Sequence, residues 1–448
     1  MGVDQDGAVG GAGGASGGAG GASGDVDEAR PRWLFPVMVA ATGVIAGLVG
    51  RFFVWLLHVI QHAVWGGASG GVSTSGSFGA AVEATDPWLR AAIVAGAGVF
   101  AGVAWFLLFR YRDGQGIVSI KHAVDGWQMP VVPTFLHATT QVVIVGLGAS
   151  IGREVAPREL SASITATVAD KLRLPAEDRR ILVGCAAGAG LAAVYSLPIS
   201  GAVMALEIFL VTVRPRAVAP ALAISALAVL VSHGFTRTEA FYAVPDLVPT
   251  ASLTVWAVVA APLIGTLGHW FGRAVHAVDT RRPTNWHLLI ALPVTFAAVG
   301  ALSMAFPQVL GNGQIAAQSA FDAAWFLPLA GIAVAKLVAT LATIRAGAWG
   351  GTLTPGVAMG AAVGALTGIA WSLVWPGTQI AAFAFLGAAA FLGCSMKAPW
   401  TGLCLVLEFT HQGATILVPA VLACGIAQAV DLWWRRRAET PIPARHPD

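Results

Sequence analysis

Apolar segments that are long enough to cross a lipid bilayer recur along nearly the whole chain, from Trp33 to Trp434. Examples run from Trp88 to Phe109, from Leu253 to Phe271 and from Phe326 to Ile344. A transmembrane helix needs about 20 consecutive, mainly apolar residues. Only 11% of the residues are charged, whereas a soluble domain has about 25%, so a water-exposed surface could not be built. The sequence therefore predicts an all-α, polytopic membrane protein.

Small residues are abundant inside these apolar segments. The chain has 54 glycines, and many stand next to alanine, as in the segment Gly184–Ala193. Small residues let membrane helices approach one another closely, so we expect a tightly packed bundle. The cysteines also lie in apolar runs and are interpreted as buried structural thiols: Cys185, Cys394, Cys404 and Cys424. Their spacing matches no metal site, so we predict no metal and no cofactor.

The two ends of the chain differ from its middle. Residues 1–31 are rich in glycine, alanine and serine and are predicted to be a disordered tail. The expected transmembrane domain spans 32–435, and 436–448 form a short tail. Arg30 and Arg32 precede the first apolar span, and three arginines from Arg435 follow the last one. The positive-inside rule then places both termini in the cytoplasm, for a multi-pass protein of the plasma (inner) membrane. The net charge of +3 is too small to indicate a nucleic-acid partner.

Two short motifs occur twice along the chain. The segment GASIGREVAP (Gly148–Pro157) resembles GAWGGTLTP (Gly347–Pro355). The segment PISGAVMALE (Pro198–Glu207) likewise resembles PWTGLCLVLE (Pro399–Glu408). Because both pairs are separated by nearly the same length of chain, they indicate a duplicated unit.

The duplicated halves are expected at about residues 33–240 and 250–435. Membrane folds made of two inverted repeats place their substrate at the repeat interface, where broken helices point their N-termini at anionic groups. Irregular backbone survives at membrane depth only where it is buried in protein or lines a cavity. The glycine-rich segments Gly148–Pro157 and Gly347–Pro355 are therefore predicted to line an ion path.

Three segments have the composition of helix starts that bind anions. They are DGQGIVSI (Asp113–Ile120), GREVAP (Gly152–Pro157) and GGTLTP (Gly350–Pro355). A dehydrated anion needs hydrogen-bond donors that hold it without trapping it, and the free N–H groups at a helix N-terminus meet that need. Any one of these segments alone is more simply a glycine turn between packed helices. Three together, two of them related by the duplication, favour an anion path.

In their order and spacing these segments resemble the CLC family of chloride channels and transporters, which carries GSGIP, GREGP and GGxFxP motifs. Lys336 and Thr340 match a lysine–threonine spacing common in that family. The resemblance covers residues 33–432. It implies a homodimer with one pathway in each subunit, a fold of two inverted halves with many tilted and broken helices, and transport of chloride or a similar monovalent anion. The resemblance is to an atypical, bacterial-type member without regulatory domains.

The resemblance also implies a set of site residues. The expected anion-binding residues are Gln115, Gly116, Ile117, Arg153, Val155, Gly351, Thr352 and Leu353, with backbone amides of Ile117, Thr352 and Leu353 around a central anion. Glu154 is the expected gate. An unprotonated carboxylate at a helix N-terminus mimics the anion and blocks the path, and protonation frees the site. The simpler interpretation of Glu154 is an acid that caps its helix.

Other charged residues have less specific interpretations. Glu207 and Glu408 occupy equivalent places in the two halves, so we expect a structural role in which each accepts hydrogen bonds from nearby backbone. Arg153 either stabilises a carboxylate or the loop, or raises the local potential for anions. His411 is interpreted as an interfacial or pore-rim histidine rather than a proton relay.

Three positions depart from the family pattern. Gln115 stands where a serine usually donates its hydroxyl to the anion, and a glutamine amide is longer but still donates N–H. Ile208 stands where exchangers often carry an inner, proton-carrying glutamate. A tyrosine expected in the last helix has no counterpart, since the tyrosines are Tyr111, Tyr195 and Tyr242. The loss at Ile208 slightly favours a passive or weakly proton-coupled pathway over a chloride/proton antiporter.

Two other classes of function deserve comparison. A proton-coupled transporter of an organic substrate would need a roomier polar site than these small donors indicate. An intramembrane enzyme would need a serine–histidine or paired-aspartate arrangement at membrane depth. The histidines are scattered and Ser150 has no evident partner in the sequence, so we do not expect an enzyme.

Overall fold

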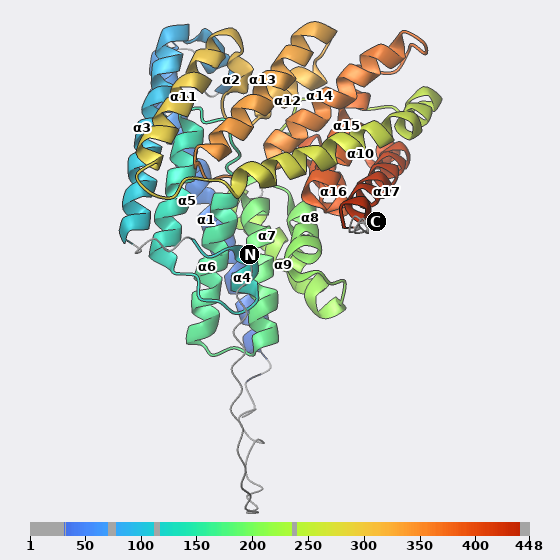
Figure 1. Ribbon diagram of the computed structural model, residues 1–448. Helices are drawn as coiled ribbons and strands as arrows, with labels where there is room; N and C mark the ends of the chain where they lie inside the picture. Colours follow the sequence, from blue (N-terminus) through green and yellow to red (C-terminus); the bar gives the residue numbers. More distant parts are fainter. Residues whose placement is uncertain (1–30, 32, 70–77, 112–116, 235–239, 440–448) are drawn as a thin grey trace, which may run out of the picture.

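The computed structural model describes residue 31 and residues 33–69, 78–111, 117–234 and 240–439. These residues form seventeen α-helices (Figure 1), with short π- and 3₁₀-helical turns between some of them. The helices of the first half are α1 (Leu34–Gln61), α2 (Phe78–Ala84), α3 (Pro87–Tyr111), α4 (Ile120–Val124), α5 (Val131–Gly146), α6 (Val155–Lys171), α7 (Ala176–Tyr195), α8 (Pro198–Met204) and α9 (Pro215–His233). Those of the second half are α10 (Ala251–Asp279), α11 (Leu288–Ala305), α12 (Gln314–Phe321), α13 (Phe326–Arg345), α14 (Leu353–Ser372), α15 (Ile380–Met396), α16 (Pro399–Phe409) and α17 (Leu417–Glu439).

Eight helical segments of the described chain are long and apolar enough to span a membrane. They are Leu34–Gly66, Pro87–Tyr111, Pro215–His233, Ala251–Asp279, Leu288–Ala305, Phe326–Arg345, Leu353–Ser372 and Ala414–Arg437. Shorter apolar helices such as α15 lie between them. The prediction of an all-α polytopic membrane protein is confirmed.

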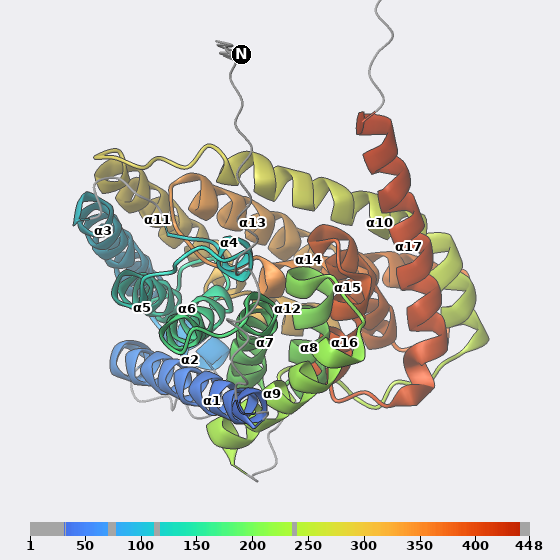
Figure 2. The same cartoon turned by 90° about the horizontal axis from the view of Figure 1, so that it is seen from below.

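The two halves repeat the same helix packing. In the first half α1 packs on α9 and α6 packs on α7, and in the second half α10 packs on α17 and α14 packs on α15. The halves are joined where α3 packs along α11 and α8 meets α16. Seen from below, α8 and α16 lie next to each other near the middle of the bundle (Figure 2). This arrangement agrees with the duplication inferred from the motifs.

The core is built from helices that are buried almost throughout, above all α7 and α15. Glycine permits the closest approaches, as the sequence predicted. A Cβ added at Gly188 of α7 would lie 2.1 Å from the Gly201 carbonyl oxygen, and one at Gly364 of α14 would lie 2.2 Å from that of Phe383. The four cysteines are free, three of them buried and Cys404 half-buried. Among the described residues no group of three potential metal ligands is found.

Candidate anion site

The two glycine-rich breaks meet in the middle of the molecule. The Gly152 N–H donates to the Gly351 carbonyl, and the Gly351 N–H donates to the Gly152 carbonyl, both at 2.8 Å. These bonds form an isolated antiparallel bridge between the halves. A Cβ at Gly350 would lie 2.7 Å from the Gly152 oxygen, so the approach requires glycine there. The segments that the sequence related by duplication are thus neighbours in space.

A helix begins directly after each side of the bridge. Val155 is the first residue of α6, and Leu353 is the first residue of α14. Neither N-cap residue, Glu154 or Thr352, caps its own helix with its side chain. The first N–H groups of a helix have no partner within the helix, so both N-termini are available to an acceptor beside the bridge.

The carboxylate of Glu154 fills this place. Its Oε1 accepts a hydrogen bond from the Leu353 N–H at 2.7 Å, and its Oε2 accepts one from the Thr354 hydroxyl at 3.2 Å. The side chain is completely buried. Glu154 therefore caps the helix of the opposite half rather than its own, in the position where a helix N-terminus would hold an anion.

The two bridge glycines form the slot that holds this carboxylate. A Cβ added at Gly152 would lie 2.2 Å from Oε2 of Glu154, and a Cβ added at Gly351 would lie 2.1 Å from Oε1. Any larger residue at either position would push the carboxylate away. The slot is small and fits a single carboxylate or an ion of similar size.

The remaining predicted anion-binding residues fall into three groups. Leu353 is buried and donates to Glu154 as described, while Thr352 and Val155 are half-buried beside the bridge. Ile117 is half-buried and packs on the hydrophobic core that contains Leu353. Gln115 and Gly116 lie outside the described residues.

Arg153 points to an aromatic cluster next to the slot. Its guanidinium carbon lies 5.1 Å from the centre of the Tyr195 ring, and Tyr195 packs on Phe241 and Phe409. The Arg153 Nε is buried and has no hydrogen-bond partner in the described part of the chain. Both interpretations of Arg153 stay predictions.

Lys336 is a buried basic residue that contacts the segment before the bridge. Its Nζ donates to the Ser150 hydroxyl at 3.0 Å and to the carbonyls of Val309 at 2.9 Å and Gly311 at 2.8 Å. The Thr340 hydroxyl lies 3.4 Å from that of Ser150. All three acceptors are neutral, and through them Lys336 anchors the break before Gly152.

The acids Glu207 and Glu408 cap helices reciprocally across the two halves. Glu207 accepts hydrogen bonds from the N–H groups of Trp400 at 3.2 Å and Thr401 at 2.7 Å, and from the Thr401 hydroxyl at 2.6 Å, at the start of α16. Glu408 accepts bonds from Ile199 N–H at 3.1 Å, Ser200 N–H at 2.6 Å and the Ser200 hydroxyl, at the start of α8. Both acids accept backbone hydrogen bonds, as we expected from their symmetry, and their structural role stays a prediction.

The other two sequence-derived positions lie away from the slot. Ile208 is half-buried in the π-helical turn Ala205–Leu210 and packs on the hydrophobic core, so an apolar side chain suits its surroundings. His411 is exposed just after α16 and lines a surface pocket together with Glu408 and Gln412. The interpretation of His411 as a rim residue stays a prediction.

A buried polar network that joins α3, α5 and α6 was not predicted from the sequence. The Trp105 indole N–H donates to Nδ1 of His137 at 3.1 Å, and Nε2 of His137 lies 3.7 Å from Oε2 of Glu159. Gln141 Nε2 donates to the same Glu159 oxygen at 3.1 Å. A signal was present, because an ionisable residue such as Glu159 at membrane depth is a functional candidate by default.

The fold has membrane-length helices in two inverted halves, and helix N-termini converge on a buried carboxylate. These features are typical of a polytopic membrane transport protein. Comparison with known families makes this more specific. Residues 97–432 match the model of the voltage gated chloride channel family, CLC. The chain belongs to this family, as its motifs indicated.

Curated relatives and solved structures agree with this assignment. The chain is 28% identical over 406 residues to a putative chloride channel protein, ClcB-like, of Ralstonia nicotianae, covering 85% of this chain and 91% of that protein. It is 26% identical over 413 residues to the voltage-gated ClC-type chloride channel ClcB of Salmonella typhimurium, covering 89% and 96%.

Among solved structures, the fold is similar to that of a slow cyanobacterial Cl⁻/H⁺ antiporter, with a TM-score of 0.74 and 20% identity, covering 91% of this chain and 99% of that one. A CLC-type fluoride/proton antiporter is also similar, with a TM-score of 0.67 and 20% identity, covering 89% and 95%. At these identities the likeness concerns the fold alone.

Proposed function

We propose that this protein transports small monovalent anions, chloride by default, through a pathway gated by Glu154. The observation that carries the proposal is the Glu154 carboxylate, which lies in the glycine slot and accepts the Leu353 N–H at the start of α14. The relatives named as chloride channels support chloride as the default ion. In this proposal the protein is a transporter or channel and not an enzyme.

The gate follows from competition for the same donors. A deprotonated Glu154 holds the Leu353 N–H and the Thr354 hydroxyl, so an anion finds them occupied. Protonation removes the charge that the helix N-terminus favours, and the neutral side chain leaves more readily. An anion then takes its place against Gly351, Thr352 and Leu353, in the positive potential of Arg153.

The mode of transport depends on how protons reach Glu154. Ile208 carries no titratable group at the position of the family's inner glutamate, which supports a passive or weakly proton-coupled pathway. The alternative is a chloride/proton antiporter, the activity for which the similar cyanobacterial protein is named. An organic substrate is a distant alternative, because the slot between Gly152 and Gly351 is small.

The proposal extends to assembly and location. We propose a homodimer with one pathway in each subunit, in the bacterial inner membrane, with both termini in the cytoplasm and residues 1–31 and 436–448 as tails. The bacterial ClcB relatives support the membrane assignment. Exposed apolar side chains at the starts of α8 and α16, such as Ile199 and Trp400, support a face that is covered by lipid or by a second subunit.

The test is chloride efflux from liposomes that contain the purified protein, recorded together with internal pH. We expect chloride efflux that rises as the medium is acidified, because protonation of Glu154 opens the slot. Glu154→Ala should remove this pH dependence, and the exposed variant Glu83→Gln serves as a matched control. Efflux of nitrate but not of chloride would mean that the transported anion is nitrate. No efflux of any anion, or an unchanged pH dependence in Glu154→Ala, would overturn the proposal.

A further inference from the structure

A second ionisable site is buried on α6, the helix that starts at Glu154. Glu159 and His137 are almost fully buried, at 7% and 0% exposure, and Nε2 of His137 lies 3.7 Å from Oε2 of Glu159. The charged groups that face Glu159 are Arg158 from its own helix, His137 from α5 and Arg282 from the segment after α10. None of the residues predicted from the sequence motifs belongs to this pair.

The hydrogen bonds fix where the proton of His137 lies. The indole of Trp105 only donates, so Nδ1 of His137 accepts its N–H at 3.1 Å. In the neutral imidazole the proton is then on Nε2, the atom that faces Glu159. The pair therefore places an N–H beside a carboxylate oxygen inside the bundle.

Glu159 differs from the structural acids of the same protein. Glu207 and Glu408 each accept three hydrogen bonds at a helix start. Glu159 accepts a single one in the described part of the chain, from Gln141. A buried carboxylate that accepts so few hydrogen bonds can change its protonation state more readily. An acid that caps a helix N-terminus is held in its charged form by the bonds that it accepts.

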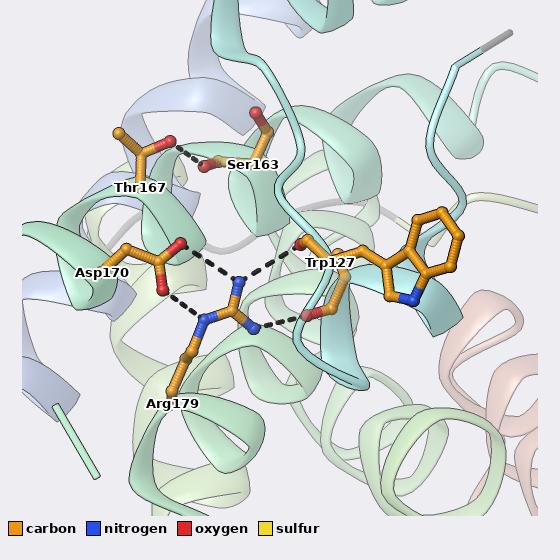
Figure 3. Close-up of polar contacts among 6 residues, drawn as sticks. Trp127, Ser163, Thr167, Asp170 and Arg179 are labelled. Atoms are coloured by element: carbon orange, nitrogen blue, oxygen red, sulfur yellow. Dashed lines mark hydrogen bonds and ion pairs between the residues drawn. The ribbon is translucent and has the colours of Figure 1, made fainter. Parts of the chain in front are cut away.

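Polar side chains continue from Glu159 along one face of α6. Ser163 and Thr167 follow at intervals of four residues, which places all three on the same side of the helix. The Ser163 hydroxyl donates to the Met129 carbonyl at 2.7 Å. The Thr167 hydroxyl donates to the Ser163 carbonyl at 2.9 Å, as Figure 3 shows. Hydroxyls accept as well as donate, so this row offers successive stations for a proton.

The row ends at a surface pocket of about 260 Å³. The pocket is lined by Gln128, Met129, Pro130, Thr167, Asp170 and Lys171. Its residues Asp170 and Lys171 lie at the connection between α6 and α7, and Figure 1 shows this connection at the lower end of the bundle. This connection carries Lys171 and Arg173, and Arg180 follows in α7, so the positive-inside rule places the pocket on the cytoplasmic side.

The other end of the row approaches the gate. Glu154 and Glu159 are five residues apart on one helix, which corresponds to a rise of about 7.5 Å. Arg158 lies near both carboxylates, since both stabilise its positive charge. Arg158 thus lies between the two acids as a shared positive neighbour.

We infer that Glu159, together with His137, is the station through which protons from the cytoplasmic side reach Glu154. A proton enters at the pocket beside Thr167, forms an O–H on the Glu159 carboxylate, and then leaves it to form an O–H on the Glu154 carboxylate. Release of the proton from Glu154 to the opposite side restores both carboxylates and completes the transfer of one proton across the membrane. This route rests on the proposed gate and supplies what Ile208 cannot.

The test measures proton and chloride movement in the same liposomes. Glu159→Gln keeps the size of the side chain and a carbonyl oxygen for Gln141, but it carries no proton. We expect the number of protons moved per chloride to fall by about a hundredfold. Thr167→Val, at the pocket, should lower the ratio without touching the pair, and Glu83→Gln should retain the ratio of the unmodified protein.

The outcomes separate this inference from the proposed function. If the unmodified protein moves no anion, the proposed function fails. If it moves chloride without protons, or if both Glu159→Gln and Thr167→Val keep the original ratio, the route through Glu159 is wrong. If Glu159→Gln does not fold, a normal ratio in Thr167→Val contradicts the route and a lowered ratio supports it.

Discussion

Gly152 and Gly351 exchange two backbone hydrogen bonds of 2.8 Å, one in each direction, and so join the two halves of the chain at their helix breaks. The bridge sets the distance between the start of α6 and the start of α14. Because Glu154 follows Gly152 by two residues, its carboxylate reaches the Leu353 N–H across the bridge. The buried Glu154 carboxylate is thus a contact between the two repeats.

Substitution of the bridge glycine should displace the gate. In Gly351→Ala the added Cβ would lie 2.1 Å from Oε1 and 2.3 Å from Cδ of Glu154, and the flexible acid side chain yields more easily than the backbone. We expect chloride efflux that no longer depends on pH, as in Glu154→Ala. The measurement is efflux from liposomes at several pH values.

A matched glycine variant controls for the change in composition. Gly96 lies in α3 with no heavy atom within 4 Å of an added Cβ, so Gly96→Ala should keep the original pH dependence. If Gly351→Ala also retains that dependence, the carboxylate does not use the slot during gating.

Loss of the buried cation should destabilise the protein strongly. Lys336→Met leaves the Ser150 hydroxyl and the carbonyls of Val309 and Gly311 without their donor. Each unsatisfied buried group costs about 1–3 kcal/mol, so we expect the free energy of unfolding to fall by at least about 3 kcal/mol. Denaturant unfolding in detergent measures this loss.

An exposed lysine gives the comparison for Lys336. Lys121→Met removes an exposed charge and should change the free energy of unfolding by less than about 0.5 kcal/mol. Equal stability of the two variants would mean that the Lys336 hydrogen bonds contribute little.

Local motifs predicted much of the fold and which helix breaks form the candidate site. Apolar length, glycine content and the repeated segments are properties of short stretches, and each depends on backbone requirements that hold wherever the stretch lies. They correctly indicated that Gly148–Pro157 and Gly347–Pro355 belong to equivalent helix breaks. They also indicated that Glu207 and Glu408 have equivalent structural roles.

Contacts between distant segments could not be derived in the same way. The sequence did not indicate that Glu154 would cap α14, or that Glu207 and Glu408 would cap each other's half, because these contacts depend on how the repeats are turned against one another. The pairing of His137 with Glu159 likewise depends on the rotation of α5 and α6 about their axes. Both residues were visible as ionisable groups, but their partnership was not.

The reciprocal caps should contribute equally to stability. Glu207→Gln and Glu408→Gln each weaken three hydrogen bonds at a helix N-terminus and remove a charge that the helix dipole favours. We expect each variant to lower the free energy of unfolding by about 1–3 kcal/mol and to leave the ratio of protons to chloride unchanged. A changed ratio in Glu207→Gln alone would give this acid a role in transport.

One arginine, Arg179, holds the loop beside the mouth of the proposed proton route, and Figure 3 shows its guanidinium between Asp170 and Trp127. The Arg179 Nε contacts Asp170 at 2.5 Å, and its terminal nitrogens donate to the carbonyls of Ala123 at 2.6 Å and Trp127 at 3.3 Å. Lysine has one nitrogen and cannot serve these acceptors together. Because Asp170 is partly exposed, solvent screens part of the loss, and we expect Arg179→Lys to lower the free energy of unfolding by about 1–2 kcal/mol.

Hydrogen exchange should rise locally around residues 120–130, where the two carbonyls lose their donor. Arg173→Lys, at an exposed position, should show neither effect; equal exchange in both variants would mean that the loop is held by other contacts.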